Sequence, residues 1–432
     1  MGRAFRVHSL NLSEDFCATR LPITPRQVTA GPPAPSWSWA VSMVINRDAS
    51  SHDFLALPLS EMRATVSRFH QRVGTAFQEH ASTGESVRKA LHHGGSDRCL
   101  VRLKRLSVDV ILRYGDDLAD LFCQFPDDVL WVQAYDYGVG FQPPGPNRVD
   151  EIEVLTRDSQ WTDEWGTRWG HAFGGVGATP LSGAIEHWSQ LDDYLAHRIP
   201  DPHAPGRLDR AREMLAPHGG KKYCVAVICP ALFERQHFLR GMENTFCDFA
   251  SNGLEVERLL ETLCDNLIEL IREWGQTQIS AYYLTDDWGS QTGLMISPAL
   301  WKKYFRGHYR RIIEEIHRLG RDVIFHSCGN VMRLVPELID LGVDVLDPIQ
   351  PKAMNLDDVG RQFGGKVAFC GGLDDQRLED YTPQQVKDAV RHAVDTLGKP
   401  FGNAYILAPA NTITPSVPFE NLQALFEACH GQ

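Results

Sequence analysis

The 432-residue sequence lacks the features that mark several classes of protein. No apolar run approaches the roughly 18 residues of a membrane span, and the first residues hold no apolar segment typical of a secretory signal. Lys and Arg number 43 against 55 Asp and Glu, a net charge of −12. A chain of this charge is not expected to bind nucleic acid or an anionic membrane as its main role. We expect a cytoplasmic protein whose partner is a small molecule.

Cysteine is also sparse, with ten residues and no Cys-x-x-Cys pair. This pattern excludes a disulfide scaffold and favours a reducing compartment. Thiols inside apolar runs are expected to pack as small hydrophobic side chains. The Gly-x-Gly-x-x-Gly fingerprint of a dinucleotide-binding sheet does not follow the first clear strand, 222–229, so nothing supports that kind of doubly wound sheet.

The second half of the chain alternates short apolar segments with amphipathic ones. The apolar segments predict strands at 222–229, 279–285, 321–326, 343–347, 366–370 and 404–408. Helices are predicted between and after them at 254–274, 298–319, 331–341, 356–363, 383–397 and 418–429. Continuous apolar strands that alternate with helices are typical of a parallel sheet covered by helices. The pattern therefore predicts an α/β fold, either a barrel or a doubly wound sheet.

The first half of the chain has a weaker pattern. Prolines interrupt residues 1–50, and apolar residues at helical spacing predict a helix over about 58–82. Further strands are predicted near 99–104, 129–135 and 151–156. We therefore expect an N-terminal extension over 1–83, partly disordered with one helix, and a single barrel domain over 84–432.

Polar or reactive side chains follow most of the predicted strands of the second half. They are Asp286, Asp287, His326, Cys328, Asp347, Gln350, Cys370, Asp374, Asn411 and Thr412. In a (β/α)8 barrel, the C-terminal ends of the strands and their loops surround one active site. This distribution favours the (β/α)8 TIM barrel over the doubly wound sheet.

His326 and Cys328 form the sharpest local motif. Residues i and i+2 of an extended backbone point the same way, so an imidazole and a thiolate could hold one ion, and zinc accepts both ligands. The alternative is a packed His and Cys without a metal. Asp286 and Asp287 could act as a general base, bind a substrate ammonium group or ligate a metal. They could also be one helix cap and one solvated side chain.

Three charged side chains, Arg235, Arg240 and Glu243, follow the strand at 222–229. Arginine is suited to bidentate binding of a substrate carboxylate, and a structural Arg–Glu pair is the alternative. The tryptophan-rich segment 161–173 predicts either the wall of a pocket or a β-hairpin packed over the barrel. The acidic pair at 127–128 is interpreted as a helix cap or a solvated face.

On these motifs, residues from about 84 to 430 resemble the uroporphyrinogen decarboxylase superfamily. The segments that carry the resemblance are DDWGSQTGLMISPALWKKYF (286–305), VIFHSCGNVMRLVPELIDLGVDVLDPIQP (323–351), FCGGLDDQ (369–376) and YILAPANTITPSVPFENLQAL (405–425). The resemblance implies a (β/α)8 barrel, in agreement with the pattern of strands and helices.

The superfamily implies two chemistries. One is metal-free decarboxylation of the acetate arms of uroporphyrinogen, and the other is zinc-dependent methyl transfer to or from a corrinoid or a thiol. The Arg-Gln-Ala-Gly-Arg segment of the decarboxylase is absent from the matching region, SDRCLVRLKRLSVDV. We therefore favour a methyltransferase or demethylase acting on a small methylated or methoxylated substrate. A metal-free decarboxylase or lyase of a carboxylated substrate is the alternative, followed by a non-enzymatic binder.

The methyltransferase branch implies that His326, Cys328 and a cysteine in the loop after the last strand bind zinc. Asn411, a poor zinc ligand, occupies that third position here. Cys370 or Asp286 could complete the site, zinc could bind weakly through two ligands and water, or this branch could have lost the metal.

The other site residues that we expect lie in or after the predicted strands. Asp286 and Asp287 are the expected catalytic residues, and the expected substrate-binding residues are Arg235, Arg240, Glu243, Tyr283, Gln350 and Asn411. The chain has no Asp-x-His-x-x-Gly signature of corrinoid binding, so a corrinoid would arrive on a partner protein. A homodimer is common for barrels of this kind.

Overall fold

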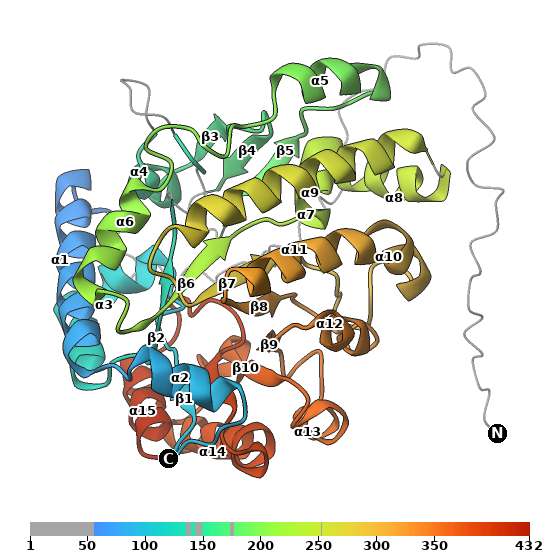
Figure 1. Cartoon of the computed structure of the whole chain (residues 1–432). Helices are drawn as coiled ribbons and strands as arrows, with labels where there is room; N and C mark the ends of the chain where they lie inside the picture. Colours follow the sequence, from blue (N-terminus) through green and yellow to red (C-terminus); the bar gives the residue numbers. More distant parts are fainter. Residues whose placement is uncertain (1–55, 135–139, 143–148, 173–176, 252) are drawn as a thin grey trace, which may run out of the picture. The chain divides into compact units, whose positions relative to one another are not determined.

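The computed structural model describes residues 56–134, 140–142, 149–172, 177–251 and 253–432, drawn in colour in Figure 1. All of them fall within the unit that spans Trp39–Gln432. The region predicted to be poorly ordered, residues 1–50, lies outside the described residues. None of the described helices is both long and apolar enough to cross a bilayer.

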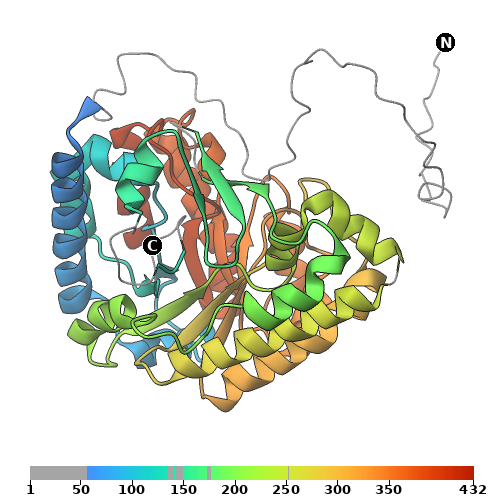
Figure 2. The same cartoon turned by 90° about the horizontal axis from the view of Figure 1, so that it is seen from above.

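The central sheet has eight strands, all parallel, in the order β1-β11-β10-β9-β8-β7-β6-β2. The strands are β1 (Leu100–Val101), β2 (Val129–Val132), β6 (Tyr223–Ile228), β7 (Ala281–Thr285), β8 (Asp322–His326), β9 (Val345–Ile349), β10 (Ala368–Leu373) and β11 (Tyr405–Pro409). In Figures 1 and 2 the helices lie outside these strands. This nearly closed sheet confirms the predicted (β/α)8 TIM barrel.

The barrel is closed between β1 and β2 by side chains. The carboxylate of Asp128 accepts a hydrogen bond from Val101 N at 2.8 Å, and Asp127 accepts from Leu103 N and Lys104 N at 2.6 and 3.0 Å. Asp128 N donates to Val101 O at 2.8 Å. We call these contacts the β1–β2 seam. The prediction that this acidic pair is a cap or a solvated face is wrong, because both carboxylates are buried at the join.

Small and branched side chains fill the inside of the barrel. They belong to alternate strand positions, and three residues of helix α2 (Gly84–Leu91) join them and close the N-terminal end. The buried set is Val87, Ala90, Leu91, Leu100, Val129, Tyr223, Val225, Ala281, Tyr283, Ile324, Val345, Ala368, Cys370, Ala404, Ile406 and Ala408. Because strand residues alternate between inside and outside, the interior can be assigned residue by residue up to the C-terminal strand ends.

The outer helices mostly follow the predicted pattern. They are α1 (Leu59–His80), α3 (Val108–Gln124), α4 (Glu151–Thr156), α5 (Leu191–His197), α6 (Asp209–Leu215), α7 (Phe233–Arg240), α8 (Met242–Ser251), α9 (Leu254–Gly275), α10 (Pro298–Tyr304), α11 (Arg306–Arg318), α12 (Val335–Leu341), α13 (Leu356–Phe363), α14 (Pro383–Ala393) and α15 (Phe419–His430). The helix predicted at 298–319 is divided at Phe305, and the one predicted at 383–397 ends in a π-helical turn over Val394–Gly398.

The strand predicted at 151–156 is wrong, because these residues form helix α4. Asp150 caps that helix by accepting a hydrogen bond from Glu153 N, and the two glutamates of the first turn suit the positive end of the helix dipole. The helix predicted over 58–82 is confirmed as α1. Its Phe69 packs edge-on against Phe122 of α3 with ring centroids 5.7 Å apart. The domain boundary at residue 83 stays a prediction.

The tryptophan-rich segment forms β-structure outside the barrel. Strands β3 (Ser159–Thr162), β4 (Arg168–His171) and β5 (Thr179–Ser182) make an antiparallel sheet in that order. Trp169 of β4 packs edge-on against Phe238 of α7 with ring centroids 4.8 Å apart. The expected hairpin over the barrel is confirmed.

Candidate metal centre and active site

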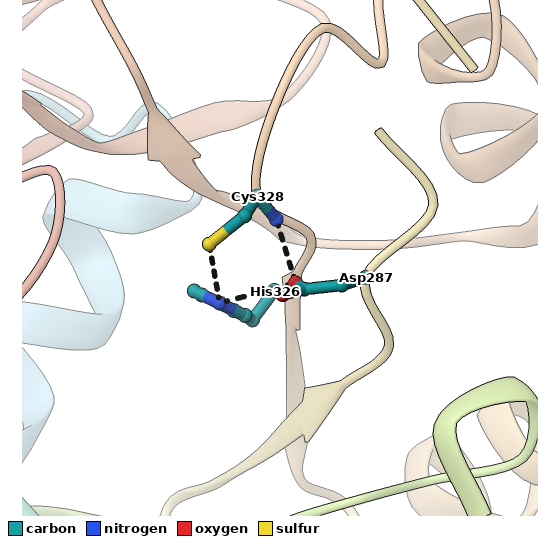
Figure 3. Close-up of side chains that lie close together, drawn as sticks. All are labelled: Asp287, His326 and Cys328. Atoms are coloured by element: carbon teal, nitrogen blue, oxygen red, sulfur yellow. Dashed lines mark hydrogen bonds and ion pairs between the residues drawn. The ribbon is translucent and has the colours of Figure 1, made fainter. Parts of the chain in front are cut away.

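Three side chains converge at the C-terminal ends of β7 and β8. His326 ends β8, and its Nε2 lies 3.4 Å from Sγ of Cys328 and 3.6 Å from a carboxylate oxygen of Asp287. Figure 3 shows the three groups facing one another. Their potential ligand atoms all lie within 4.8 Å of one another, and they are the one such group of three that the described part of the chain holds. We call it the Asp287–His326–Cys328 group.

Asp347 of β9 sets the orientation of His326 by contacting the other ring nitrogen, Nδ1. Nδ1 of His326 lies 2.5 Å from a carboxylate oxygen of Asp347, which also accepts a hydrogen bond from the hydroxyl of Tyr283 at 2.7 Å. Arg105 pairs with the same carboxylate at 3.3 Å. Burial alone would raise the pKa of Asp347, but the charge of Arg105 and the hydrogen bond from His326 hold that pKa well below its usual range. The ionised carboxylate therefore keeps the proton on Nδ1 and leaves Nε2 free to bind a cation.

A close approach of two loops holds Asp287 against Cys328. Cys328 N donates to the Asp287 carboxylate at 2.8 Å. Gly329 has a φ of +81°, and a Cβ there would collide with the backbone of Gly289. Gly329 N in turn donates to the side-chain oxygen of Gln350 at 2.9 Å. Gln350, a predicted substrate-binding residue, is thus placed as a support for the loop after β8.

Asp286 points away from its neighbour Asp287. Its buried carboxylate accepts hydrogen bonds from the backbone N–H groups of residues 232–234 at 2.7–3.1 Å, and from the hydroxyl of Tyr309. Burial raises the pKa of Asp286 to about 7 against these hydrogen bonds. Of the two adjacent carboxylates, the structure places Asp287 with His326, while Asp286 anchors the start of α7.

The two predicted arginines have partners of their own. The guanidinium of Arg235 lies over the ring of Trp165 at 4.4 Å, and Arg240 is buried in an ion pair with Asp248 at 2.9 Å. Glu243 is exposed on α8. Arg240 therefore pairs with Asp248 rather than with Glu243, and these three side chains are placed apart from the Asp287–His326–Cys328 group.

Cys370 and Asn411 also lie outside this group. Cys370 is buried in β10 beside Asp347. Asn411 lies in the loop after β11, where its backbone N–H donates to Asp375 and its side-chain oxygen accepts from Thr412 N, at 2.8 and 2.9 Å. Tyr283, by contrast, is brought to the site as a hydrogen-bond partner of Asp347.

Comparison with known proteins agrees with this architecture. Residues 220–432 match the family model described as "Uroporphyrinogen decarboxylase (URO-D)". This part of the chain belongs to the uroporphyrinogen decarboxylase superfamily. Asp287, His326, Cys328 and Asp347 all fall inside the matched region, whereas Arg105 precedes it.

The superfamily domain has distant relatives among curated proteins and solved structures. A uroporphyrinogen decarboxylase from Legionella pneumophila (strain Lens) is 24% identical over 194 residues, 45% of this chain and 51% of that protein. The chain thus spans about half the length of the curated relatives it matches. The structure of a methyltransferase from Methanosarcina mazei aligns with a TM-score of 0.56 at 14% identity, covering 81% of this chain and 98% of that one. At that identity the likeness concerns the fold.

Three charged residues near the site, Asp347, Arg105 and Glu234, were given no role from the sequence alone. In the sequence, Asp347 was one of many polar residues at the ends of predicted strands. Arg105 follows β1, a strand of only two residues. Glu234, in the first turn of α7, accepts a hydrogen bond from Thr285 at 3.2 Å. Burial and then the charge of Asp287 raise the pKa of Glu234 well above its usual value. The signal available in the sequence was position, because each lies at the end of a predicted strand or in the segment that follows one.

Proposed function

We propose that the chain is a zinc-dependent methyltransferase or demethylase of the uroporphyrinogen decarboxylase superfamily. It would move a methyl group between a small methylated or methoxylated substrate and a corrinoid or thiol acceptor. The observation that carries the proposal is the Asp287–His326–Cys328 group, in which Asp347 directs Nε2 of His326 toward the other two ligand atoms.

The donor set fits zinc. A nitrogen, a sulfur and an oxygen are the three atom types that zinc accepts in proteins, and sites with three protein ligands are typical of catalytic zinc. Burial and then the charge of Asp287 raise the pKa of the Cys328 thiol well above its usual value. A cation at this position would stabilise the thiolate against that repulsion. Bound zinc would lower the pKa of a thiol acceptor or polarise the heteroatom that carries the methyl group.

The chain's own residues prepare the site. Asp347 keeps the proton on Nδ1 of His326, and Arg105 compensates the charge of Asp347. The hydrogen bond from Cys328 N holds the Asp287 carboxylate in place. Three protein ligands leave a coordination position for substrate or water. Because the sequence has no corrinoid-binding signature, a corrinoid would be presented by a partner protein.

The test is zinc content, measured by mass spectrometry on the full chain. We expect about one zinc per chain in the wild type, its loss in His326→Ala and Cys328→Ala, and a reduced content in Asp287→Asn. Cys370→Ser is the matched control, since this thiol is also buried, in the interior of the barrel, but lies outside the group. Wild-type protein that binds no zinc, or zinc that is lost in Cys370→Ser and kept in Asp287→Asn, would contradict the assignment.

A metal-free decarboxylase or lyase is the second candidate. The curated relatives named uroporphyrinogen decarboxylase favour it, as do the arginines Arg102 and Arg105 after β1. It predicts that turnover of a carboxylated substrate is undiminished after the protein has been stripped with a chelator. A methyltransferase that depends on zinc would lose its activity under the same treatment and regain it on adding zinc.

A further inference from the structure

A small cavity lies outside the barrel interior, where the β3–β4 turn approaches helix α9. Its volume is about 30 Å³, and its walls come from that turn, the segment 200–207, the end of β6, and the helices α7 and α9. The polar side chains that line it are Glu164, Arg207, Arg235 and Asn266, and leucines of α9 form much of the remainder. A water molecule needs roughly 10–15 Å³ of such space, so the cavity has room for two or three waters or for one compact ion.

Arg235 brings a buried guanidinium to this cavity. It is 7% exposed, and its guanidinium lies over the indole ring of Trp165, another lining residue, at 4.4 Å. Within the described ranges its one hydrogen bond runs from Nη1 to Asp163 at 3.5 Å, the long limit for such a bond. Asp163 does not depend on that bond, because its carboxylate accepts from Trp165 N, Thr167 N and Trp169 Nε1 at 2.9 Å each. Nε and Nη2 of Arg235 are therefore left for a bound group.

Arg240, on the same helix, provides an internal comparison. Its guanidinium also lies over an indole ring, that of Trp188, at 4.0 Å. Its Nε and Nη2 donate to Asp248 at 2.9 and 3.2 Å, and its Nη1 donates to two backbone carbonyl oxygens at 2.7 and 3.1 Å. Two arginines of α7 thus stack on tryptophan in the same way, but Arg240 uses every nitrogen of its fork and Arg235 leaves one edge unused.

The charges around the cavity favour an anion. Arg207 donates to both carboxylate oxygens of Glu164 at 3.0 and 2.7 Å, so these two charges compensate each other. Arg235 is the third charged lining residue, and only the long contact with Asp163 offsets its charge. The leucines of α9 exclude water from one side, and hydrogen bonds to a charged group are stronger in such surroundings. The planar edge of a guanidinium matches the two oxygens of a carboxylate.

We propose that this cavity binds a compact planar oxyanion, of the formate, acetate or bicarbonate kind, through the free edge of Arg235. Nε and Nη2 donate to two oxygens of the ion, and the volume of the cavity limits the third substituent to a hydrogen, a hydroxyl or a methyl group. No member of the Asp287–His326–Cys328 group lines the cavity, so the site is separate from the candidate metal centre. A bound ion would join the β3–β4 turn to α7 and α9. The inference goes beyond the proposed function and does not depend on it.

The test is titration of the full chain with formate, acetate and bicarbonate labelled with carbon-13, measured by the broadening of the carboxyl resonance. Acetamide has the shape of acetate without its charge, and pivalate has the charge with three more carbon atoms. We expect at least one of the three anions to bind, and acetamide and pivalate to bind at least tenfold more weakly than that anion. Wild-type protein that binds none of the three, or that binds acetamide or pivalate equally well, would overturn the site.

Three variants test the charge and the cavity separately. Arg235→Gln should weaken anion binding at least tenfold. Arg235→Lys keeps the charge but loses the planar fork, so it should weaken binding by a smaller factor. Leu270→Phe leaves Arg235 in place and adds bulk to the cavity wall that α9 provides, so it should also weaken binding at least tenfold. Anion binding that is unchanged in Arg235→Gln or in Leu270→Phe would overturn the proposal.

The matched control is Arg240→Gln, from the same helix. Arg258→Gln is a second control that does not disturb the core, because Arg258 is an exposed residue of α9 paired with Asp192. We expect both variants that fold to bind the anion as tightly as the wild type. Weaker binding in Arg258→Gln would show that the general charge of the surface attracts the ion, and would overturn the assignment to Arg235.

A carboxylate can also ligate a metal ion, so the titration is repeated on chelator-treated protein and on His326→Ala. We expect anion binding to be retained in both, whatever their zinc content. Binding lost in both and kept in Arg235→Gln would place the anion at the metal centre and overturn the proposal. A wild type that takes up no zinc but binds the anion through Arg235 would refute the zinc mechanism and support the cavity site.

Discussion

Histidine–aspartate pairs lie at both ends of strands β8 and β9, and the surroundings of the pairs differ between the two ends. At the C-terminal end, His326 and Asp347 are both buried, and the second ring nitrogen of His326 faces Cys328. At the N-terminal end, Asp322 pairs with His92 at 3.0 Å, but that histidine side chain is 48% exposed. The same kind of pair therefore directs an imidazole nitrogen toward a thiol where it is buried, and forms a contact with solvent where it is exposed.

The N-terminal end is organised as a structural network. Asp322 also accepts a hydrogen bond from the buried hydroxyl of Tyr223 at 2.5 Å. Asp344, just before β9, accepts from Val323 N at 2.8 Å and pairs with His317 of α11 at 3.0 Å. No metal-ligand group forms here among the described residues. This division agrees with the general rule that the C-terminal face of such barrels holds the chemistry and the N-terminal face the stability.

The largest effect on the free energy of unfolding is expected for Asp286→Ala. This variant tests whether residues at the C-terminal end of the barrel also stabilise the fold. The substitution leaves three backbone N–H groups and the hydroxyl of Tyr309 without their acceptor. We expect a loss of about 3–5 kcal/mol of unfolding free energy, measured by denaturant titration. Asp287→Ala is the control, with a loss of about 1 kcal/mol and with zinc binding impaired. A stable Asp286→Ala protein that lost only activity would instead make Asp286 catalytic.

The second prediction compares the two aspartates of the pairs. Asp347→Asn should lower zinc affinity by about 10–100-fold, because the carboxylate that orients His326 is replaced by an amide. Asp322→Asn, at the opposite end of the same pair of strands, should leave zinc affinity unchanged. Competition with a chromophoric chelator measures both. Equal affinities in the two variants would remove the distinction between the two ends.

The smallest effect concerns pH at the N-terminal end. The hydrogen bonds to Asp322 and Asp344 raise the pKa values of His92 and His317 above 6.5. Their contribution is therefore fully present below about pH 6.5. It is lost as the pH rises through the raised folded-state values. His92→Asn and His317→Asn should each cost up to about 1 kcal/mol at pH 6, since both pairs are partly solvated.

The same variants should cost less at pH 8.5, measured by unfolding at the two pH values. Zinc content should not change in either variant, since neither histidine contacts the Asp287–His326–Cys328 group. A cost that grows with pH would contradict the assignment of these pairs as stabilising contacts of protonated histidine.

Local pattern was sufficient to predict most of the barrel but failed where distant contacts decide the structure. The strands from β6 to β11 are continuous apolar runs, and each was predicted to within a few residues. Residues 151–156, EIEVLT, alternate charged and apolar side chains as a half-buried strand would, and the cap from Asp150 made them a helix instead. The burial of Asp127 depends on N–H groups more than 20 residues away, which no local window contains.

The same limit applies to the site. The sequence alone predicted that His326 and Cys328 lie together, because their spacing places both side chains on one side of an extended backbone. Asp286 and Asp287 are equivalent in the sequence, and only the contact between Gly289 and Gly329 and the position of α7 distinguish their directions. Arg102 and Arg105 were not assigned a role because β1 comprises only Leu100–Val101, and their partners lie in β2, β7 and β9.

The β1–β2 seam has a consequence for the motions of the barrel. Elsewhere in the sheet, adjacent strands are joined by ladders that must open several backbone hydrogen bonds together. Here a single backbone hydrogen bond, from Asp128 N to Val101 O, is supplemented by two side-chain carboxylates that hold the amides of Val101, Leu103 and Lys104. Rotation of a side chain is enough to release these amides, so they should exchange their protons with solvent before those of the neighbouring ladders. Arg102 lies between the released positions. The barrel should therefore open first at the seam around this buried arginine, while the neighbouring strand ladders stay closed.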